Sequence, residues 1–238
     1  MNEKLFKLFT CGKKIVMLGI CSIFVAALIL GCSQSEPHLN WIDKWLKEPI
    51  CQPPCWEHIT PGVTTDNEIS QILKNSVDVL EVKGAEINNG KLCISWNMIG
   101  CQDGATAGVA CTRPNWIDNQ EIATIKINLA CGGASVLLED IINSYGQPDY
   151  LWPEFSEIRG CSAKILYLKQ GMVLTAFGKS RGEKMKITKY WKIPEMTLFN
   201  AGSDLQTTLD SLYWLGISGI SNAKNVSYWK GYGEYLCK

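Results

Sequence analysis

The sequence predicts an α+β fold in which short helices pack on a mostly antiparallel sheet. Two observations point to this fold. Apolar residues recur at helical spacing in three separate stretches, and between these stretches the period changes to the two-residue alternation of half-buried strands. Helix-then-strands occurs twice and a last helix follows. We therefore expect two units, at about 59–131 and 132–197, and a C-terminal cap at 198–238.

The first unit begins with a predicted helix at about 66–75. Thr65 and Glu68 have the spacing of a capping box. The apolar stripe of this helix is formed by Ile69, Ile72 and Leu73. Strands are expected at about 92–98 and 125–129, where apolar and polar residues alternate. Between them, "GCQDGATAGVACTRPNW" has no periodicity and is predicted to be a long loop held by one or two disulfides.

The second unit begins with the clearest helix signal of the chain, at about 135–145. Ser135 is the expected N-cap and Gly146 the expected stop. Strands are expected in "AKILYLKQGMVLTAFG" and "KMKITKYWKI", with a hairpin turn at Gln170-Gly171. A third helix is expected to begin at Ser203 and to pack on the same face of the sheet as the other two.

The N-terminus has the layout of an export signal. An apolar run at 15–30 follows a segment that contains Lys4, Lys7, Lys13 and Lys14. As a helix this run would extend about 24 Å, which is short for a hydrocarbon core of ~30 Å. We therefore interpret residues 1–31 as a signal peptide, with an uncleaved anchor as the alternative. Residues 32–50 would then be a tether with a turn or two of amphipathic helix, and 51–238 a single domain.

The end of the apolar run carries a more specific motif. Ile29-Leu30-Gly31-Cys32 resembles the bacterial lipobox, whose cysteine is diacylated and becomes the mature N-terminus. The resemblance implies cleavage behind Gly31, acylation of Cys32 and an extracytoplasmic, lipid-anchored location on the cell membrane. Because no aspartate follows the cysteine directly, the resemblance implies the outer membrane in a cell that has two.

Composition limits the classes of partner. Without residues 1–31 the chain has 207 residues, 19 of them basic and 22 acidic, and a net charge of about −3. This length is sufficient for one sizeable core. Nucleic-acid binding requires clustered Lys and Arg to displace counterions, and the sequence has no such cluster. We therefore exclude nucleic acid as a partner.

Eight cysteines remain after the signal peptide and Cys32 are set aside. They are Cys51, Cys55, Cys93, Cys101, Cys111, Cys131, Cys161 and Cys237. In an oxidising compartment this even number predicts up to four disulfides, whose pairing the sequence leaves open. Cys51 with Cys55 is the local bridge that we expect. The alternative, a zinc site at Cys51, Cys55 and His58, is disfavoured by the few ligands and by the compartment, and no metal or cofactor is expected.

A second resemblance concerns the first helix and the segment before it. "PPCWEHITPGVTTDNEISQIL" is similar to a segment that recurs in uncharacterised bacterial lipoproteins. Both helix-then-strands units also resemble the repeat of small outer-membrane-assembly lipoproteins and of β-lactamase-inhibitor-type folds. The resemblance implies a binding or scaffolding lipoprotein that has no catalytic residues.

The sequence contains no recognisable catalytic set. His58 is the only histidine in 51–238, and no serine lies in a G-x-S-x-G motif. Gly178-Lys179-Ser180 lacks the glycine that a phosphate loop requires five residues earlier, because Val173 stands there. Glu154 and Glu157 are the residue types of a glycosidase pair, but acidic residues three apart in a loop are more typical of a solvated face. We expect a non-enzymatic protein.

Aromatic residues are the remaining functional signal. All nine tryptophans follow the signal peptide, and Tyr228, Trp229 and Tyr232 lie together in a Gly-rich tail. These three are candidate ligand-stacking residues, although the tail is equally consistent with a strand that Cys237 tethers. Two functions follow. We favour binding of another envelope protein, because the domain offers shape and a Cys-rich loop at 100–116 without catalytic chemistry. The alternative is an envelope glycan-binding module that uses exposed Trp and Tyr.

Overall fold

The computed structural model describes residues 41–88, 90–101, 105–114, 120–131, 135–156, 160–178, 184–200, 204–214 and 226–237. All of them belong to one compact unit, Asn40–Lys238. The predicted signal peptide and Cys32 lie outside the described residues.

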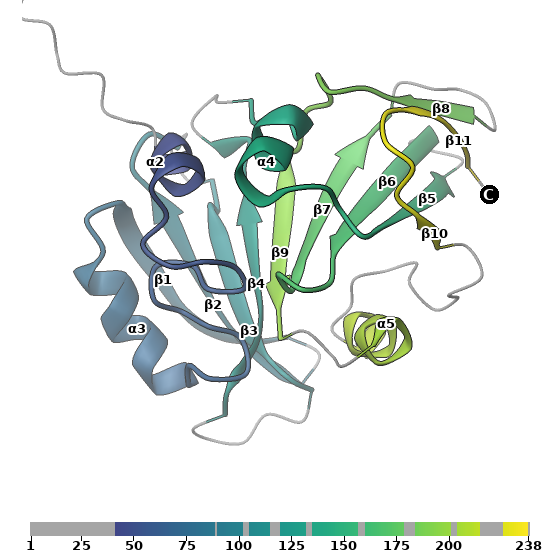
Figure 1. The fold of residues 1–238 in the computed structure, drawn as a ribbon. Coiled ribbons are helices and arrows are strands. Elements are labelled where there is room, and N and C mark those ends of the chain that lie inside the picture. Colours follow the sequence, from purple (N-terminus) through teal and green to yellow (C-terminus); the bar gives the residue numbers. More distant parts are fainter. Residues whose placement is uncertain are drawn as a thin grey trace, which may run out of the picture. The chain divides into compact units, whose positions relative to one another are not determined.

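A large antiparallel sheet organises this unit (Figure 1). Its nine described strands have the order β1-β2-β3-β4-β9-β7-β6-β5-β10. They are β1 (Val79–Asn88), β2 (Lys91–Met98), β3 (Gly108–Thr112), β4 (Ile122–Asn128), β5 (Tyr150–Ser156), β6 (Gly160–Tyr167), β7 (Met172–Phe177), β9 (Glu195–Phe199) and β10 (Ser227–Tyr228). The described helices are α2 (Trp41–Lys47), α3 (Asp66–Asn75), α4 (Leu138–Tyr145) and α5 (Leu205–Trp214). A separate ribbon pairs β8 (Lys184–Ile187) with β11 (Gly233–Leu236). The fold is α+β, as predicted.

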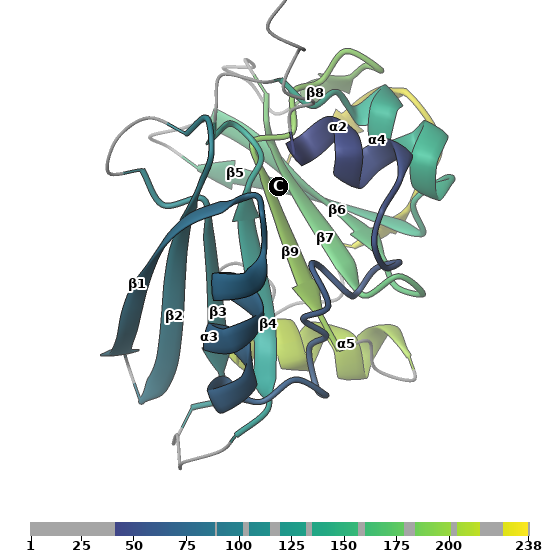
Figure 2. The same ribbon diagram turned by 90° about the vertical axis from the view of Figure 1, so that its left-hand side faces the viewer.

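The helices cover both faces of the sheet. One face contributes Ile165, Leu174 and Leu198 to the main core, together with buried residues of α2, α3 and α4. The neighbouring residues Leu166, Val173 and Phe199 point to the opposite face, where they pack with Leu209 and Leu212 of α5. In Figure 2, β6 and β7 run between α4 above and α5 below. The prediction that all helices pack on one face is therefore wrong. Consecutive apolar residues in β6, β7 and β9 make both faces apolar, and both must be buried.

The two halves of the sheet have the same order of elements. In each half, a helix precedes three hairpin-connected strands, and a last strand pairs at the centre, where β4 and β9 are antiparallel neighbours. The N-cap of each helix forms a bridge shortly before that central strand. Thr65 pairs with Glu121, directly before β4, and Leu137 pairs with Lys192, three residues before β9. Each helix is therefore fixed to the strand that closes its own half.

Several local predictions are confirmed. Helix α3 has the predicted bounds, and the Thr65 amide donates to Glu68 Oε2 at 2.9 Å, which completes the capping box. The turn at Gln170-Gly171 joins β6 to β7, and Gly171 has the positive φ, 55°, that this turn requires. Helix α4 begins later than predicted. Its N-cap is Leu137, not Ser135, because Asp140 Oδ2 accepts the Leu137 amide at 3.0 Å.

Other strand predictions need correction. The segment 100–116, predicted as a loop, contains β3. The expected strand "KMKITKYWKI" is extended only over Lys184–Ile187, which leaves the main sheet to pair with β11. The edge strand β1 is not predicted, and β9 runs across residue 197, the expected end of the second unit. Short strands with Gly and Ala, such as β3, have weak strand propensity, and an exposed edge strand such as β1 lacks apolar alternation.

Candidate functional site

Four disulfides join the eight cysteines that follow the predicted lipid anchor. The pairs, with their Cα–Cα distances, are Cys51–Cys55 (5.7 Å), Cys93–Cys111 (4.2 Å), Cys101–Cys131 (4.8 Å) and Cys161–Cys237 (6.0 Å). Cys51 and Cys55, weighed above as metal ligands, are bonded to each other. In the described part of the chain, no group of three or more His, Cys, Asp and Glu side chains could hold a metal ion.

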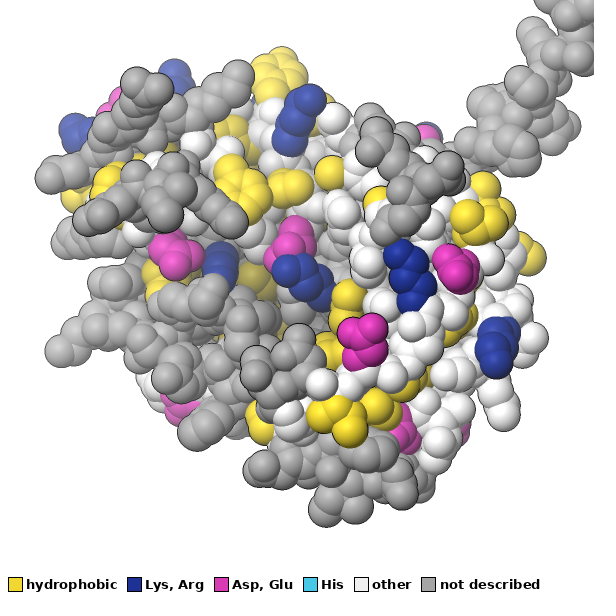
Figure 3. All heavy atoms as spheres, turned by 180° about the vertical axis from the view of Figure 1, so that it is seen from behind, with side chains coloured by type: hydrophobic (Ala, Val, Ile, Leu, Met, Phe, Trp, Pro, Cys, Tyr) yellow, Lys and Arg dark blue, Asp and Glu magenta, His cyan; other side chains and the backbone are white. Residues whose placement is uncertain are grey.

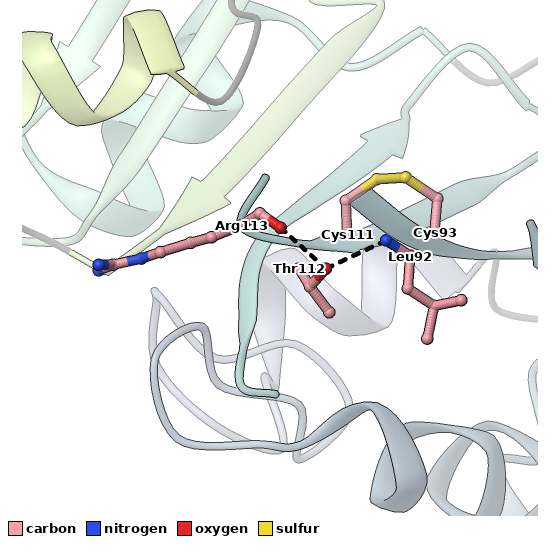
Figure 4. Close-up of a disulfide and its surroundings, with 5 residues drawn as sticks. All are labelled: Leu92, Cys93, Cys111, Thr112 and Arg113. Atoms are coloured by element: carbon pink, nitrogen blue, oxygen red, sulfur yellow. Dashed lines mark hydrogen bonds between the residues drawn. A yellow bond between two sulfur atoms is a disulfide. The ribbon is translucent and has the colours of Figure 1, made fainter. Parts of the chain in front are cut away.

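The Cys93–Cys111 bridge fixes part of the predicted Cys-rich loop to the sheet. It crosses from β2 to β3, as Figure 4 shows. Beside it, Thr112 Oγ1 accepts the Leu92 amide at 3.1 Å and donates to the Arg113 carbonyl at 3.1 Å. The described residues 105–114 therefore form part of the scaffold instead of a free binding loop.

The C-terminal aromatic tail is joined to the rest of the fold at four places. Cys237 is bonded to Cys161 of β6, and β10 pairs with β5 while β11 pairs with β8. The Trp229 amide also donates to the Asp149 carbonyl at 3.1 Å. The tail therefore covers the start of the β5 edge, at Tyr150 and Leu151.

The three candidate stacking residues do not behave alike. Trp229 packs within the molecule, since its ring lies 6.2 Å from that of Tyr235 and its Nε1 donates to Gln147 Oε1 at 2.8 Å. The Tyr228 ring contacts the Tyr150 ring, with 4.9 Å between their centroids, but Tyr228 is 71% exposed. Tyr232 meets Trp229 edge-on and is 44% exposed. The structure thus leaves Tyr228 and Tyr232 accessible, and Trp229 orders the tail.

The opposite edge of the sheet is open. β1 is the first strand in the sheet order, and no described strand pairs with its outer side. Its side chains are largely accessible, because Leu80 is 62% and Ile87 66% exposed. Nearby, Val77 and Ile99 are 76% and 51% exposed. Sequence reasoning missed this site because it missed the strand.

A polar cluster holds the beginning of β1 in place. Asp78 directly precedes β1, and its carboxylate pairs with Lys44 of α2 at 3.0 Å. The Ser76 hydroxyl donates to Glu57 Oε2 at 3.2 Å. Burial raises the pKa of Glu57 above its usual value, against the attraction of Lys44 and the hydrogen bond from Ser76. This cluster joins α2, the turn before α3 and the start of the edge strand.

Two further observations bear on chemistry and location. Of the suspected carboxylate pair, Glu157 lies outside the described residues. Glu154 lies in β5, not in the predicted loop, and is 4.0 Å from the ammonium of Lys164. None of the described helices has both the length and the apolar character needed to span a membrane.

The side of the molecule opposite α2, α3 and α4 is mixed in character. Figure 3 shows basic and acidic side chains beside one another there, with hydrophobic groups in separate patches. Lys126 and Glu195, on the neighbouring strands β4 and β9, form such a pair at 2.6 Å. Large fields of one sign do not occur among the described residues of this view.

Comparisons of the chain with protein-family models, with curated proteins and with solved structures find no match.

Proposed function

We propose that the protein is a non-enzymatic, lipid-anchored envelope protein that binds another envelope protein through the open edge of β1. One observation carries this proposal. The tail pairs with the start of the β5 edge through β10, whereas β1 has no described strand along any part of its outer side and exposes Leu80 and Ile87.

An open edge can bind a partner strand because its outer amides and carbonyls are unpaired. The regular part of β1 for such pairing is Ala85–Asn88, since register shifts interrupt its ladder with β2 between Val79 and Glu81 and between Val82 and Ala85. Bulges and charges such as Glu81 and Glu86 are features that prevent identical edges from pairing. They support a distinct protein as the partner.

We also propose that the two halves of the sheet are copies of one helix-then-strands unit, with α5 and the tail added afterwards. The equivalent bridges of Thr65 and Leu137 support this, as do the two helix starts 72 residues apart. The four disulfides support an oxidising compartment outside the cytoplasm, which is where a lipid anchor at Cys32 would place the domain.

Site-specific photo-crosslinking in native envelopes tests the proposal. A photoreactive side chain is placed at Leu80 or at Ile87, which lie seven residues apart on β1. A partner strand that pairs with Ala85–Asn88 and continues along the edge past the register shifts would contact both positions, a span of about 23 Å for seven residues of strand. We expect one dominant adduct with the same protein from both positions.

The matched control is Val63, an aliphatic residue that is 69% exposed and lies outside β1. A probe at Val63 should not give the adduct. The proposal is contradicted if positions 80 and 87 give no adduct, or give the same mixture of adducts as position 63.

Glycan binding is the second candidate function, and the exposure of Tyr228 and Tyr232 favours it. If the tail binds glycans through these rings, Tyr228→Ala should weaken saturable binding of envelope polysaccharide and leave the β1 adducts unchanged. Equal binding by wild type and Tyr228→Ala would contradict a role for this ring.

A further inference from the structure

A cleft of about 480 Å³ lies between the end of β7, strand β8 and the turn before β9. This volume is within the range of small-ligand sites. The lining residues are Phe177, Gly178, Met185, Lys186, Tyr190, Trp191 and Lys192. Two of the rings are accessible, because Phe177 is 49% and Tyr190 65% exposed.

Two exposed lysines, Lys186 and Lys192, line the cleft, and neither forms an ion pair with a described acidic residue. The acidic residue next to them is Glu234, which lies opposite Lys186 where β11 pairs with β8. The neighbouring Lys189 is already paired with Glu139 at 3.0 Å, and its ammonium lies 4.9 Å from the centre of the Tyr190 ring. A chain with a net charge of about −3 after residue 31 thus has a local site for an anion.

The backbone at Gly178 keeps the aromatic wall accessible. A β-carbon at this position would lie 3.2 Å from the Cys161 carbonyl oxygen and 3.5 Å from Cζ2 of Trp191, so a longer side chain would fill the space in front of that ring. Glycine leaves the approach open. Aromatic rings and exposed ammonium groups that line one cleft match a ligand that has both apolar C–H faces and carboxylates.

We propose that this cleft binds a polysaccharide that carries carboxylates, such as a polyuronate. The sugar faces would stack on Phe177 and Tyr190, and the carboxylates would pair with Lys186 and Lys192. The inference rests on the glycan-binding candidate and gives it a ligand class and a different set of residues. It does not depend on the protein-binding edge at β1, since β7 lies in the other half of the sheet and β8 in the separate ribbon.

Isothermal titration of the soluble domain, with its disulfides intact, tests the proposal. The ligand is a six-residue alginate oligosaccharide, compared with neutral maltohexaose and with hexaglutamate. We expect saturable binding of the alginate oligosaccharide that weakens with added salt, and no measurable binding of the other two.

The variants separate charge from stacking. Lys186→Gln with Lys192→Gln should weaken alginate binding about tenfold, and Tyr190→Ala should weaken it several-fold. All three side chains are exposed, so these substitutions should not disturb the fold. Gly178→Leu should block binding by filling the cleft. The matched controls are Lys74→Gln and Lys169→Gln, which remove exposed lysines outside the cleft and should change the affinity by less than about twofold.

Each other outcome overturns the proposal. Equal binding of maltohexaose would indicate a neutral stacking site, and equal binding of hexaglutamate would indicate a site for acidic peptides. If Tyr228→Ala abolishes binding while the cleft variants retain it, the glycan candidate survives and the cleft assignment fails. If no probe binds, both fail, and the crosslinking from β1 is unaffected.

Discussion

The Trp56 ring stacks on the Trp96 ring, with 5.1 Å between their centroids and 22° between their planes. Both side chains are buried, and Trp56 also pairs with Ile59 across a tight turn. The Pro-Cys-Trp segment before α3 is thereby fixed to β2. On the adjacent strand β3, Gly108 pairs with Trp96 and lies against its ring. A β-carbon at Gly108 would overlap the indole. The Pro-Cys-Trp motif is therefore explained by core packing.

This contact predicts that Gly108→Ala is strongly destabilising. The added methyl group must displace the Trp96 ring from a well-packed core, so we expect a loss of about 1–3 kcal/mol or more in the free energy of unfolding. Urea denaturation measures it. In a Trp96→Leu background, which removes the overlapping atoms, the same substitution should cost clearly less. Equal costs in the two backgrounds would contradict the steric explanation.

The second prediction concerns the buried stripe of α4. Ile141 is fully buried, whereas its neighbour Ile142 is partly buried at the rim of the core. Ile141→Ala should cost about 2–5 kcal/mol because it leaves a cavity. Ile142→Ala is the matched control and should cost less. A loss below about 1 kcal/mol for Ile141→Ala would mean that α4 does not pack as described.

Sequence patterns predicted the elements that local physics determines. The bounds of α3 follow from the Thr65–Glu68 box and the Gln170-Gly171 turn from the glycine. Alternating apolar residues predicted strands at about 92–98 and 125–129, where the structure has β2 and β4. In each case the signal lies within a few residues of the element that it specifies.

The missed features depend on contacts between distant residues. Strand β3 is a strand because Trp96 and Cys93 of β2 lie beside it, and its own sequence shows little preference. The pairing of Cys161 with Cys237 spans 76 residues and cannot be derived from spacing. The position of α5 depends on which face of β6 and β7 remains to be covered. The open edge of β1, central to the proposed function, has the least regular apolar pattern of the longer strands.

The third prediction is a pH dependence of stability that originates at Glu57. Burial raises the pKa of this carboxyl in the folded protein above its ordinary value of 4.5, so the folded state binds more protons than the unfolded state. Its contribution to stability is fully present below pH 4.5 and is lost as pH rises through the folded pKa. Glu57→Gln should therefore flatten the fall in unfolding free energy between about pH 4.5 and neutrality.

Ser76→Ala should change the pH dependence of stability in the opposite direction. It removes the hydrogen bond that favours the Glu57 carboxylate, so the pKa of Glu57 should rise further and the fall with pH should steepen. Chemical denaturation across this pH range measures all three proteins. Parallel profiles for wild type and Glu57→Gln would contradict the assignment.

The fourth prediction concerns the proposed lipid anchor. Cys32→Ala should abolish incorporation of labelled fatty acid and release the protein from membranes. Cys51→Ser with Cys55→Ser is the control, since these cysteines form a disulfide and should not be acylated. A full-length, membrane-embedded precursor in wild-type cells would support the uncleaved anchor instead.

The last prediction compares the disulfide that closes the longest loop of chain with the one that closes the shortest. Cys161–Cys237 joins residues 76 apart, and no other disulfide lies within that stretch, whereas Cys51–Cys55 joins residues 4 apart. The chain-entropy relation gives about 4.5 kcal/mol for the long closure and about 2 kcal/mol for the short one. The double variant Cys161→Ser with Cys237→Ser should therefore lose more stability than Cys51→Ser with Cys55→Ser. It should also release the tail, so that trypsin cuts at Lys230 in the native state. Equal losses, or a tail that stays protected, would show that the pairing of β11 with β8 holds the C-terminus without the disulfide.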